Sequence, residues 1–145
     1  MKRDTWFLFA ILAVLATVFA LRGFGGPAAT PGVFSDEYTL EEARAVSAET
    51  GKPILALATA DWCPPCQSLK RGALSDPDVV AYLRENTVPV YIEESSGIEA
   101  IRELRVKRYP TTVVLNGEAV LGIVEGGASS EKYLGLIKQA VEQAG

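Results

Sequence analysis

The chain has 145 residues, 48% of them apolar, which is enough to bury the core of one domain but not of two. It contains no histidine and only two cysteines, which argues against a structural zinc site with four Cys or His ligands. Beyond residue 22 it carries 11 basic and 17 acidic side chains. Because no basic stripe is present, we expect no nucleic-acid partner.

The first residues predict attachment to a membrane. Sixteen residues from Trp6 to Leu21 carry no charge, and Lys2, Arg3 and Arg22 flank them. As a helix this run would be about 24 Å long, which lies between a signal-peptide core and a full membrane span. We expect residues 1–22 to form an uncleaved signal anchor that is inserted in the membrane through residues 6–21. A cleaved signal peptide and a buried helix of the domain are the alternatives.

The flanking charges also predict where the rest of the chain lies. Positively charged residues before a membrane helix tend to stay in the cytoplasm, and Lys2 and Arg3 precede this one. We therefore expect a single-pass protein of the cell membrane with an extracytoplasmic domain, periplasmic or exported. Residues 23–33 are rich in Gly and Pro and are interpreted as a flexible linker. Residues 34–145 then form the one domain, expected to be monomeric.

Within this domain, helical and strand patterns alternate. Thr39 and Gly51 are typical of the start and end of a helix, and Asn116-Gly117 is the strongest short-range signal for a hairpin. The expected strands are residues 54–60, 88–92, 111–115 and 119–124. The expected helices are residues 39–51, 63–73, one that starts at 75–78, 97–104 and 129–143.

The two cysteines, Cys63 and Cys66, stand where an apolar strand turns into a helix. Unpaired backbone N–H groups and the positive end of the dipole at a helix start favour a thiolate at the first cysteine. The second thiol, one turn later, can attack a mixed disulfide made by the first. The pair is therefore interpreted as a redox couple. An inert structural disulfide and a metal site shared between chains are the alternatives.

The order of these elements and their motifs resemble the thioredoxin superfamily over about residues 34–145. The motifs are Ala60-Asp61-Trp62-Cys63-Pro64-Pro65-Cys66, Tyr109-Pro110-Thr111-Thr112, Asn116-Gly117-Glu118 and Glu125-Gly126-Gly127. The segments 51–53 and 75–79 look most like the C-terminal thioredoxin-like domain of bacterial thiol:disulfide interchange proteins. The resemblance implies an α/β thioredoxin fold, in which helices flank a central mixed sheet.

The resemblance also implies roles for particular residues. Cys63 would be the attacking thiolate, Cys66 the resolving thiol, and Pro110 a cis-proline that faces them. A cis bond there would turn the backbone of Tyr109 outward to pair with an extended substrate peptide. Trp62 would contact the partner, with ordinary packing as the equal alternative. The Cys63–Cys66 disulfide would act without a further cofactor or metal, and the partners would be proteins with thiols or disulfides.

Two departures from the family pattern concern the chemistry. Members usually bury an acid six positions before the first cysteine, where this chain has Leu57, and the lysine that accompanies it is absent from strand 88–92. Pro64 and Pro65 also lack N–H groups, so the Cys66 amide is the main donor left for the Cys63 sulfur.

The predicted function is a membrane-anchored extracytoplasmic thiol:disulfide oxidoreductase, working as a reductase or electron relay. Two other classes stay open, a redox-inactive binding module with this fold and a thiol-based metallochaperone.

Overall fold

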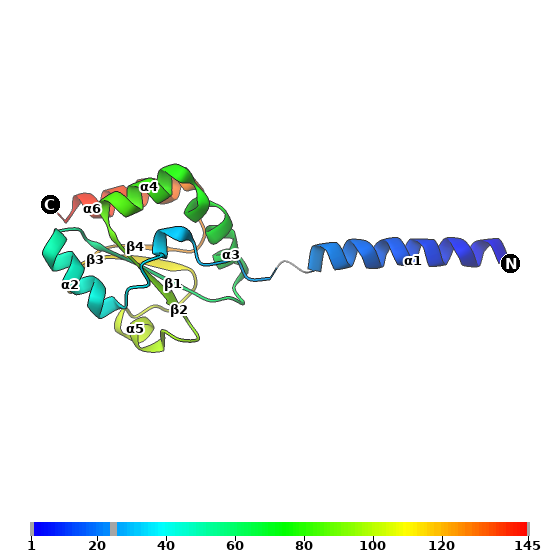
Figure 1. The fold of residues 1–145 in the computed structure, drawn as a ribbon, viewed down its shortest axis with the longest axis horizontal. Helices are drawn as coiled ribbons and strands as arrows, with labels where there is room; N and C mark the ends of the chain where they lie inside the picture. The colour runs from blue at the N-terminus through cyan, green and yellow to red at the C-terminus, as the bar shows by residue number, and fades with distance from the viewer. Residues whose placement is uncertain (1, 24–25, 145) are drawn as a thin grey trace.

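The computed structural model describes residues 2–23 and 26–144, and the side chains of residues 7–18 and 26–144. Figure 1 shows a long N-terminal helix followed by a domain of strands and helices. The helices are α1 (Lys2–Gly23), α2 (Leu40–Thr50), α3 (Pro64–Arg71), α4 (Pro77–Asn86), α5 (Ile98–Glu103) and α6 (Ser130–Glu142). The strands are β1 (Ile54–Thr59), β2 (Val88–Glu93), β3 (Thr111–Asn116) and β4 (Ala119–Glu125). Two short 3-10 turns are η1 (Gly32–Phe34) and η2 (Ala73–Ser75).

The predicted signal anchor coincides with most of α1. Among the residues that the structure describes, no helix is both long enough and apolar enough to cross a membrane. The side chains of residues 1–6 and 19–22, which belong to the predicted anchor, lie outside the described ones.

The sheet has the strand order β2-β1-β3-β4. Strand β1 pairs in parallel with β2 and antiparallel with β3, and β3 pairs antiparallel with β4. The expected mixed sheet is therefore confirmed. All six residues of β1 are buried, as its unbroken apolar run predicted, because both faces of this central strand are covered.

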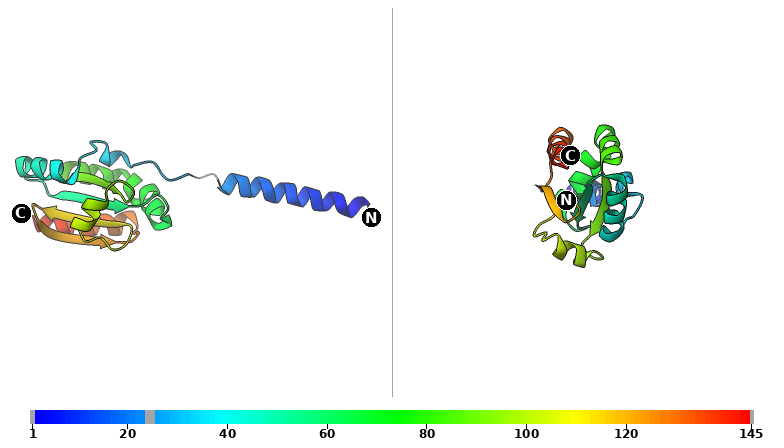
Figure 2. Two further views of the ribbon diagram at one scale, coloured as in Figure 1. Left: turned by 90° about the horizontal axis from the view of Figure 1, so that it is seen from below. Right: turned by 90° about the vertical axis from the view of Figure 1, so that its left-hand side faces the viewer.

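Helices cover the two faces of the sheet, and each face has its own core (Figure 2). On one face Leu55 and Leu57 pack with residues of α3, α4 and α6. On the other face Ile54 and Ala56 pack with residues of α2 and α5. This arrangement follows from the two-residue period of the strand, which sends successive side chains to opposite faces.

Local signals explain where the helices begin and end. The Thr39 side chain accepts from the Glu42 amide and the Glu42 carboxylate accepts from the Thr39 amide, which makes a capping box at the start of α2. Gly51 ends that helix in the left-handed conformation with φ 72°. The active-site helix α3 ends at Arg71, two residues earlier than expected, because Gly72 leaves helical geometry and a 3-10 turn follows.

The turn η1 lies at the junction of the predicted linker and domain. Val33 and Phe34 are 3% and 1% exposed and belong to the core that contains Leu57. The Phe34 ring lies 5.6 Å from the Tyr91 ring, centroid to centroid. The chain therefore packs against the domain before α2 begins.

Candidate active site

Cys63 and Cys66 form a disulfide at the carboxyl end of β1, with their Cα atoms 5.3 Å apart. Both residues are buried, Cys63 being 3% and Cys66 1% exposed. They form a small apolar cluster with Ala60, and Tyr109 packs against it. The disulfide is thus covered on most sides by protein.

Backbone geometry places Cys63 immediately before the first residue of α3. Its backbone is extended, and its Sγ accepts a hydrogen bond from the Cys66 amide at 3.3 Å. Pro64 and Pro65 occupy the first two helical positions, where a missing N–H costs least. Cys66 is therefore the first residue of α3 with an amide to donate, as the sequence predicted.

The bond between Tyr109 and Pro110 is cis, as the family resemblance implies. Pro110 is buried, and its carbonyl accepts a hydrogen bond of 2.8 Å from the Gly126 amide. The motif that contains Gly126 thereby comes beside the disulfide, since the next residue, Gly127, lies against the Pro65 carbonyl. Burial raises the pKa of the Tyr109 phenol, and the Glu94 and Glu93 carboxylates raise it further.

Trp62 is 69% exposed, although it stands directly before a buried cysteine. Its ring meets that of Tyr109 edge to face, with centroids 6.1 Å apart, and its Nε1 donates to Glu94 Oε2 at 2.7 Å. These two contacts orient the indole and leave most of it in solvent. The arrangement fits a surface that touches a partner.

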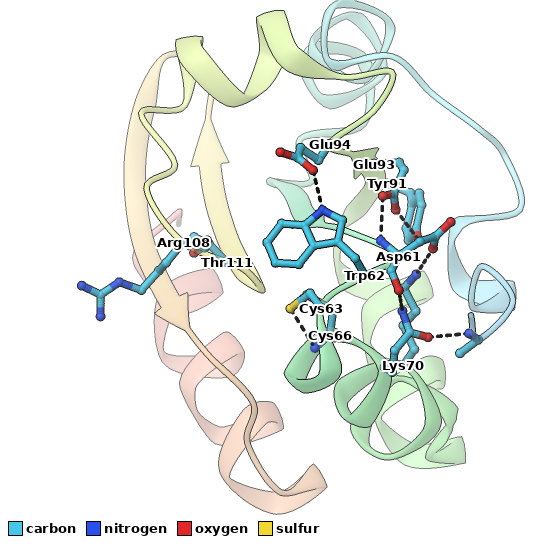
Figure 3. The surroundings of a disulfide bond; sticks show 12 residues. Asp61, Trp62, Cys63, Cys66, Lys70, Tyr91, Glu93, Glu94, Arg108 and Thr111 are labelled. Carbon is cyan, nitrogen blue, oxygen red and sulfur yellow. Dashed lines mark hydrogen bonds and ion pairs between the residues drawn. A yellow bond between two sulfur atoms is a disulfide. The ribbon is translucent and has the colours of Figure 1, made fainter. Parts of the chain in front are cut away.

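A polar network lies to one side of the disulfide, between α3 and the end of β2 (Figure 3). The Lys70 Nζ donates to Asp61 Oδ1 at 3.3 Å and lies 5.1 Å from the centroid of the Tyr91 ring. The Tyr91 hydroxyl donates to Glu93 Oε2 at 3.3 Å, and Glu93 Oε1 accepts from the Asp61 amide at 2.9 Å. This network ties the loop before Cys63 to its neighbouring strand and helix.

The predicted linker also contacts this region. Gln67 of α3 donates to the Asp61 carbonyl at 3.1 Å and accepts a short hydrogen bond from the Ala28 amide. Arg71 donates to the Gly26 carbonyl at 3.0 Å. The linker residues Gly26 and Ala28 are therefore hydrogen-bonded to side chains of α3.

Leu57 occupies the position at which the family pattern places an acid. It is 1% exposed, and its partners in the neighbouring strands are Tyr91 of β2 and Thr112 of β3. The accompanying lysine is absent from β2, as predicted from the sequence. Lys70 of α3 instead brings an ammonium to the Tyr91 ring.

A family model described as thioredoxin-like matches residues 36–117, more than half of the chain. The chain belongs to the thioredoxin-like family. Its matched segment includes β1, α3 and the Tyr109–Pro110 bond, so the disulfide and the cis peptide lie within the part of the chain that matches the family.

Similar proteins agree with this assignment. Thiol:disulfide interchange protein DsbD 1 of Pseudomonas aeruginosa is 34% identical to this thioredoxin-like chain, and the match covers 52% of this chain but only 16% of that protein. A thioredoxin from Thermus thermophilus is 27% identical with a TM-score of 0.67, covering 74% of this chain and 88% of its own. The oxidised C-terminal domain of DsbD from Neisseria meningitidis has the same fold, with 17% identity, a TM-score of 0.59, and coverage of 69% and 90%. Membership of the thioredoxin-like family and the Cys63–Cys66 pair indicate an enzyme of the thiol:disulfide oxidoreductase class.

The sequence did not lead us to expect the polar surroundings of the cysteine pair in this thioredoxin-like domain. The structure brings Cys63, Cys66 and Tyr109 together and places Trp62 at their edge. The contribution of Lys70 was missed, although its spacing gave a signal, since it stands four residues after Cys66 on the buried face of α3. In the described part of the chain, no group of three or more His, Cys, Asp or Glu residues could hold a metal ion.

Proposed function

We propose that this protein is a membrane-anchored, extracytoplasmic thiol:disulfide oxidoreductase that works as a reductase or electron relay. The observation that carries the proposal is the Cys63–Cys66 disulfide at the start of α3. Tyr109, whose bond to Pro110 is cis, packs against it. The match to a thiol:disulfide interchange protein supports the same class of reaction.

The reaction proceeds in two exchanges. In the reduced protein the Cys63 thiolate attacks a disulfide of a partner protein, which forms a mixed disulfide and expels one partner thiolate. The Cys66 thiol then loses its proton, and its sulfur attacks Cys63 Sγ. This step forms the Cys63–Cys66 disulfide and releases the second partner thiolate. The partner has gained two electrons, and this protein has lost two.

The geometry at Cys63 supports a reducing role. A strongly oxidising pair stabilises its thiolate through several donors at the helix start, which makes the reduced form favourable. Here Pro64 and Pro65 supply none, and the Cys66 amide is the one donor recorded for Cys63 Sγ among the described residues. The reduced form is therefore less stabilised, and the pair gives up electrons more readily.

Trp62, Tyr109 and Pro110 are proposed to bind the partner. The exposed indole of Trp62 offers an apolar contact beside the disulfide. The cis bond at Pro110 suits the start of a strand where a substrate peptide pairs with the backbone.

The proposed location rests on the sequence. A charge-free run of sixteen residues follows Lys2 and Arg3, and such a pattern directs the remainder of a chain out of the cytoplasm. The test is a reporter that is active only outside the cytoplasm, fused after Gly32. We expect an active reporter in the membrane fraction. An active but soluble reporter would indicate a cleaved signal peptide instead of an anchor. An inactive reporter would overturn the proposed topology.

The redox roles are tested by trapping. Cys66→Ser should accumulate mixed disulfides with protein partners through Cys63, because the resolving sulfur is gone, whereas Cys63→Ser should accumulate none. Alkylation of the reduced wild type near neutral pH should modify Cys63 first. Preferential modification of Cys66 would reverse the two roles, and a wild type without any disulfide turnover would favour the binding module instead.

A further inference from the structure

Lys70 is the one charged residue among the described ones that the fold buries almost completely. Its side chain is 1% exposed, whereas its partner Asp61 is 56% exposed. A buried ammonium costs free energy unless it is paired, so lysine is rarely found in such a place. Because burying this charge is costly, we looked for a role that the charge could have at this position.

The side chain runs back along α3 toward the disulfide. Cys66 and Lys70 are four residues apart and lie on the same buried face of the helix. Helical side chains lean toward the N-terminus, and the Lys70 Nζ reaches Asp61, two residues before Cys63 (Figure 3). The ammonium therefore lies beside the loop that leads into Cys63, on the helix that carries Cys66.

The charges around this ammonium leave it protonated. Burial alone would lower the pKa of Lys70, but the interactions with Tyr91 and Asp61 outweigh burial and raise it above its usual value. Burial is the main reason that the pKa of Tyr91 is also raised, so its phenol is neutral at physiological pH. Glu93 binds the Tyr91 hydroxyl and the Asp61 amide rather than Lys70.

Arg108, drawn among the surroundings of the disulfide in Figure 3, is 69% exposed and lies 3.6 Å from the Glu125 carboxylate. The other titratable groups near the disulfide are acids and a neutral phenol. Glu94 binds the exposed indole of Trp62, and Tyr109 packs on the cysteines with a raised pKa. Lys70 is consequently the buried positive charge on the side of α3 that carries Cys66, where the family's acid is replaced by Leu57.

We propose that Lys70 is a positioning residue for the resolving step, whose buried charge stabilises the Cys66 thiolate, so that Cys66 can lose its proton to solvent without an internal base. The inference rests on the proposed function. In the mixed disulfide, Cys66 must release its proton to solvent before it attacks Cys63 Sγ and frees the partner thiolate. A fixed cation along the same helix lowers the pKa of that thiol, typically by one unit or more when the charge is close.

Rapid mixing of the reduced full-length protein with an excess of a fluorescent disulfide peptide separates two phases. The attack of Cys63 depends on peptide concentration, whereas resolution by Cys66 does not. Resolution is then followed between about pH 5 and pH 9, a range that spans the ionisation of a perturbed thiol. Lys70→Met removes the charge and keeps the length of the side chain, and Lys70→Arg keeps the charge.

For Lys70→Met we expect the midpoint of the resolution profile to rise by about one pH unit and the rate at pH 7 to fall about tenfold. Lys70→Arg should restore most of the rate. Lys138→Met is the matched control, because Lys138 Nζ also lies 5.1 Å from a ring centroid, that of Tyr82, away from the disulfide. It should leave the profile unchanged. Should Lys70→Met not fold, Lys70→Gln, which can still bond Asp61, gives the same comparison.

Asp61→Asn, at an exposed residue, should shift the midpoint of the resolution profile in the opposite direction. It removes the counter-charge of Lys70 and should move the midpoint down. An unchanged profile in folded Lys70→Met or Lys70→Gln, or an upward shift in Asp61→Asn, would overturn the role of Lys70 while leaving the redox function intact. Absence of both phases in the wild type would instead overturn the proposed function itself.

Discussion

An aspartate in place of Leu57 would put a carboxyl into the core at the position where the family pattern expects one. Leu57 is 1% exposed and packs in the core that includes Leu69 of α3. Burying a leucine side chain contributes about 1.5 to 3 kcal/mol, most of which the shorter aspartate loses. A buried carboxyl without a good partner costs about 1 to 3 kcal/mol more.

Together these terms predict that Leu57→Asp lowers the free energy of unfolding by about 4 kcal/mol at neutral pH. For a domain of about 110 residues this corresponds to a fall in Tm of roughly 16 °C. Only the carboxyl term depends on pH. Burial raises the pKa of the new carboxyl in the folded state, so the cost of its ionisation is absent below the unfolded pKa, grows as pH rises from the unfolded to the folded pKa, and is constant above the folded pKa.

Urea unfolding of the wild type, Leu57→Asp and Leu57→Asn at pH 4 and pH 8 measures the two terms separately. Leu57→Asn has nearly the same shape without the charge, so its loss of stability should be equal at both pH values. Leu57→Asp should match it at pH 4 and be less stable at pH 8, by about 1.4 kcal/mol for each unit by which burial raises the pKa of the carboxyl. Equal losses for the two variants at pH 8 would refute the reasoning, because they would mean that the carboxylate finds a partner in the core.

Four other substitutions test the packing and the surface. The Tyr133 hydroxyl shares a 2.9 Å hydrogen bond with Thr112, so Tyr133→Phe should cost about 1 kcal/mol in urea unfolding at pH 7, and a gain in stability would contradict this. Because burial raises the pKa of Tyr133 to about 12, the wild type should lose about 2 kcal/mol of stability as pH rises from 10 to 12, a loss that Tyr133→Phe lacks. A Cβ on Gly122 would lie 2.6 Å from the Cβ of Ala140, so Gly122→Ala should cost about 1 to 3 kcal/mol in thermal unfolding. Adding Ala140→Gly should relieve the clash and restore part of this stability. Additive losses from the two substitutions would argue against the clash. Trp62→Ala should slow exchange with protein disulfides severalfold but leave reduction by a small dithiol unchanged, and equal slowing of both reactions would place the indole in the chemistry rather than in partner binding.

Local features of the sequence were sufficient to predict the elements of the domain. The capping residues Thr39 and Gly51 and the Asn116-Gly117 turn act within a few residues of themselves, so their effects are visible in the chain. The two-residue period of a strand and its unbroken apolar run predicted that β1 would be covered on both faces. The Cys63–Cys66 pair followed from the same local reasoning, because three residues of spacing at a helix start bring two sulfurs together.

The surroundings of the disulfide were decided by the tertiary structure. A lysine in a helix is ordinarily solvated, and only the packing of α3 against Tyr91 of β2 shows that Lys70 is buried and reaches Asp61. The register of β1 with β2 puts Tyr91 beside Leu57, which no spacing along the chain reveals. The hydrogen bonds that Arg71 donates to Gly26 and that Ala28 donates to Gln67 likewise join segments 45 and 39 residues apart. Such contacts depend on how elements are rotated and aligned against one another, and that alignment arises only when the whole core packs.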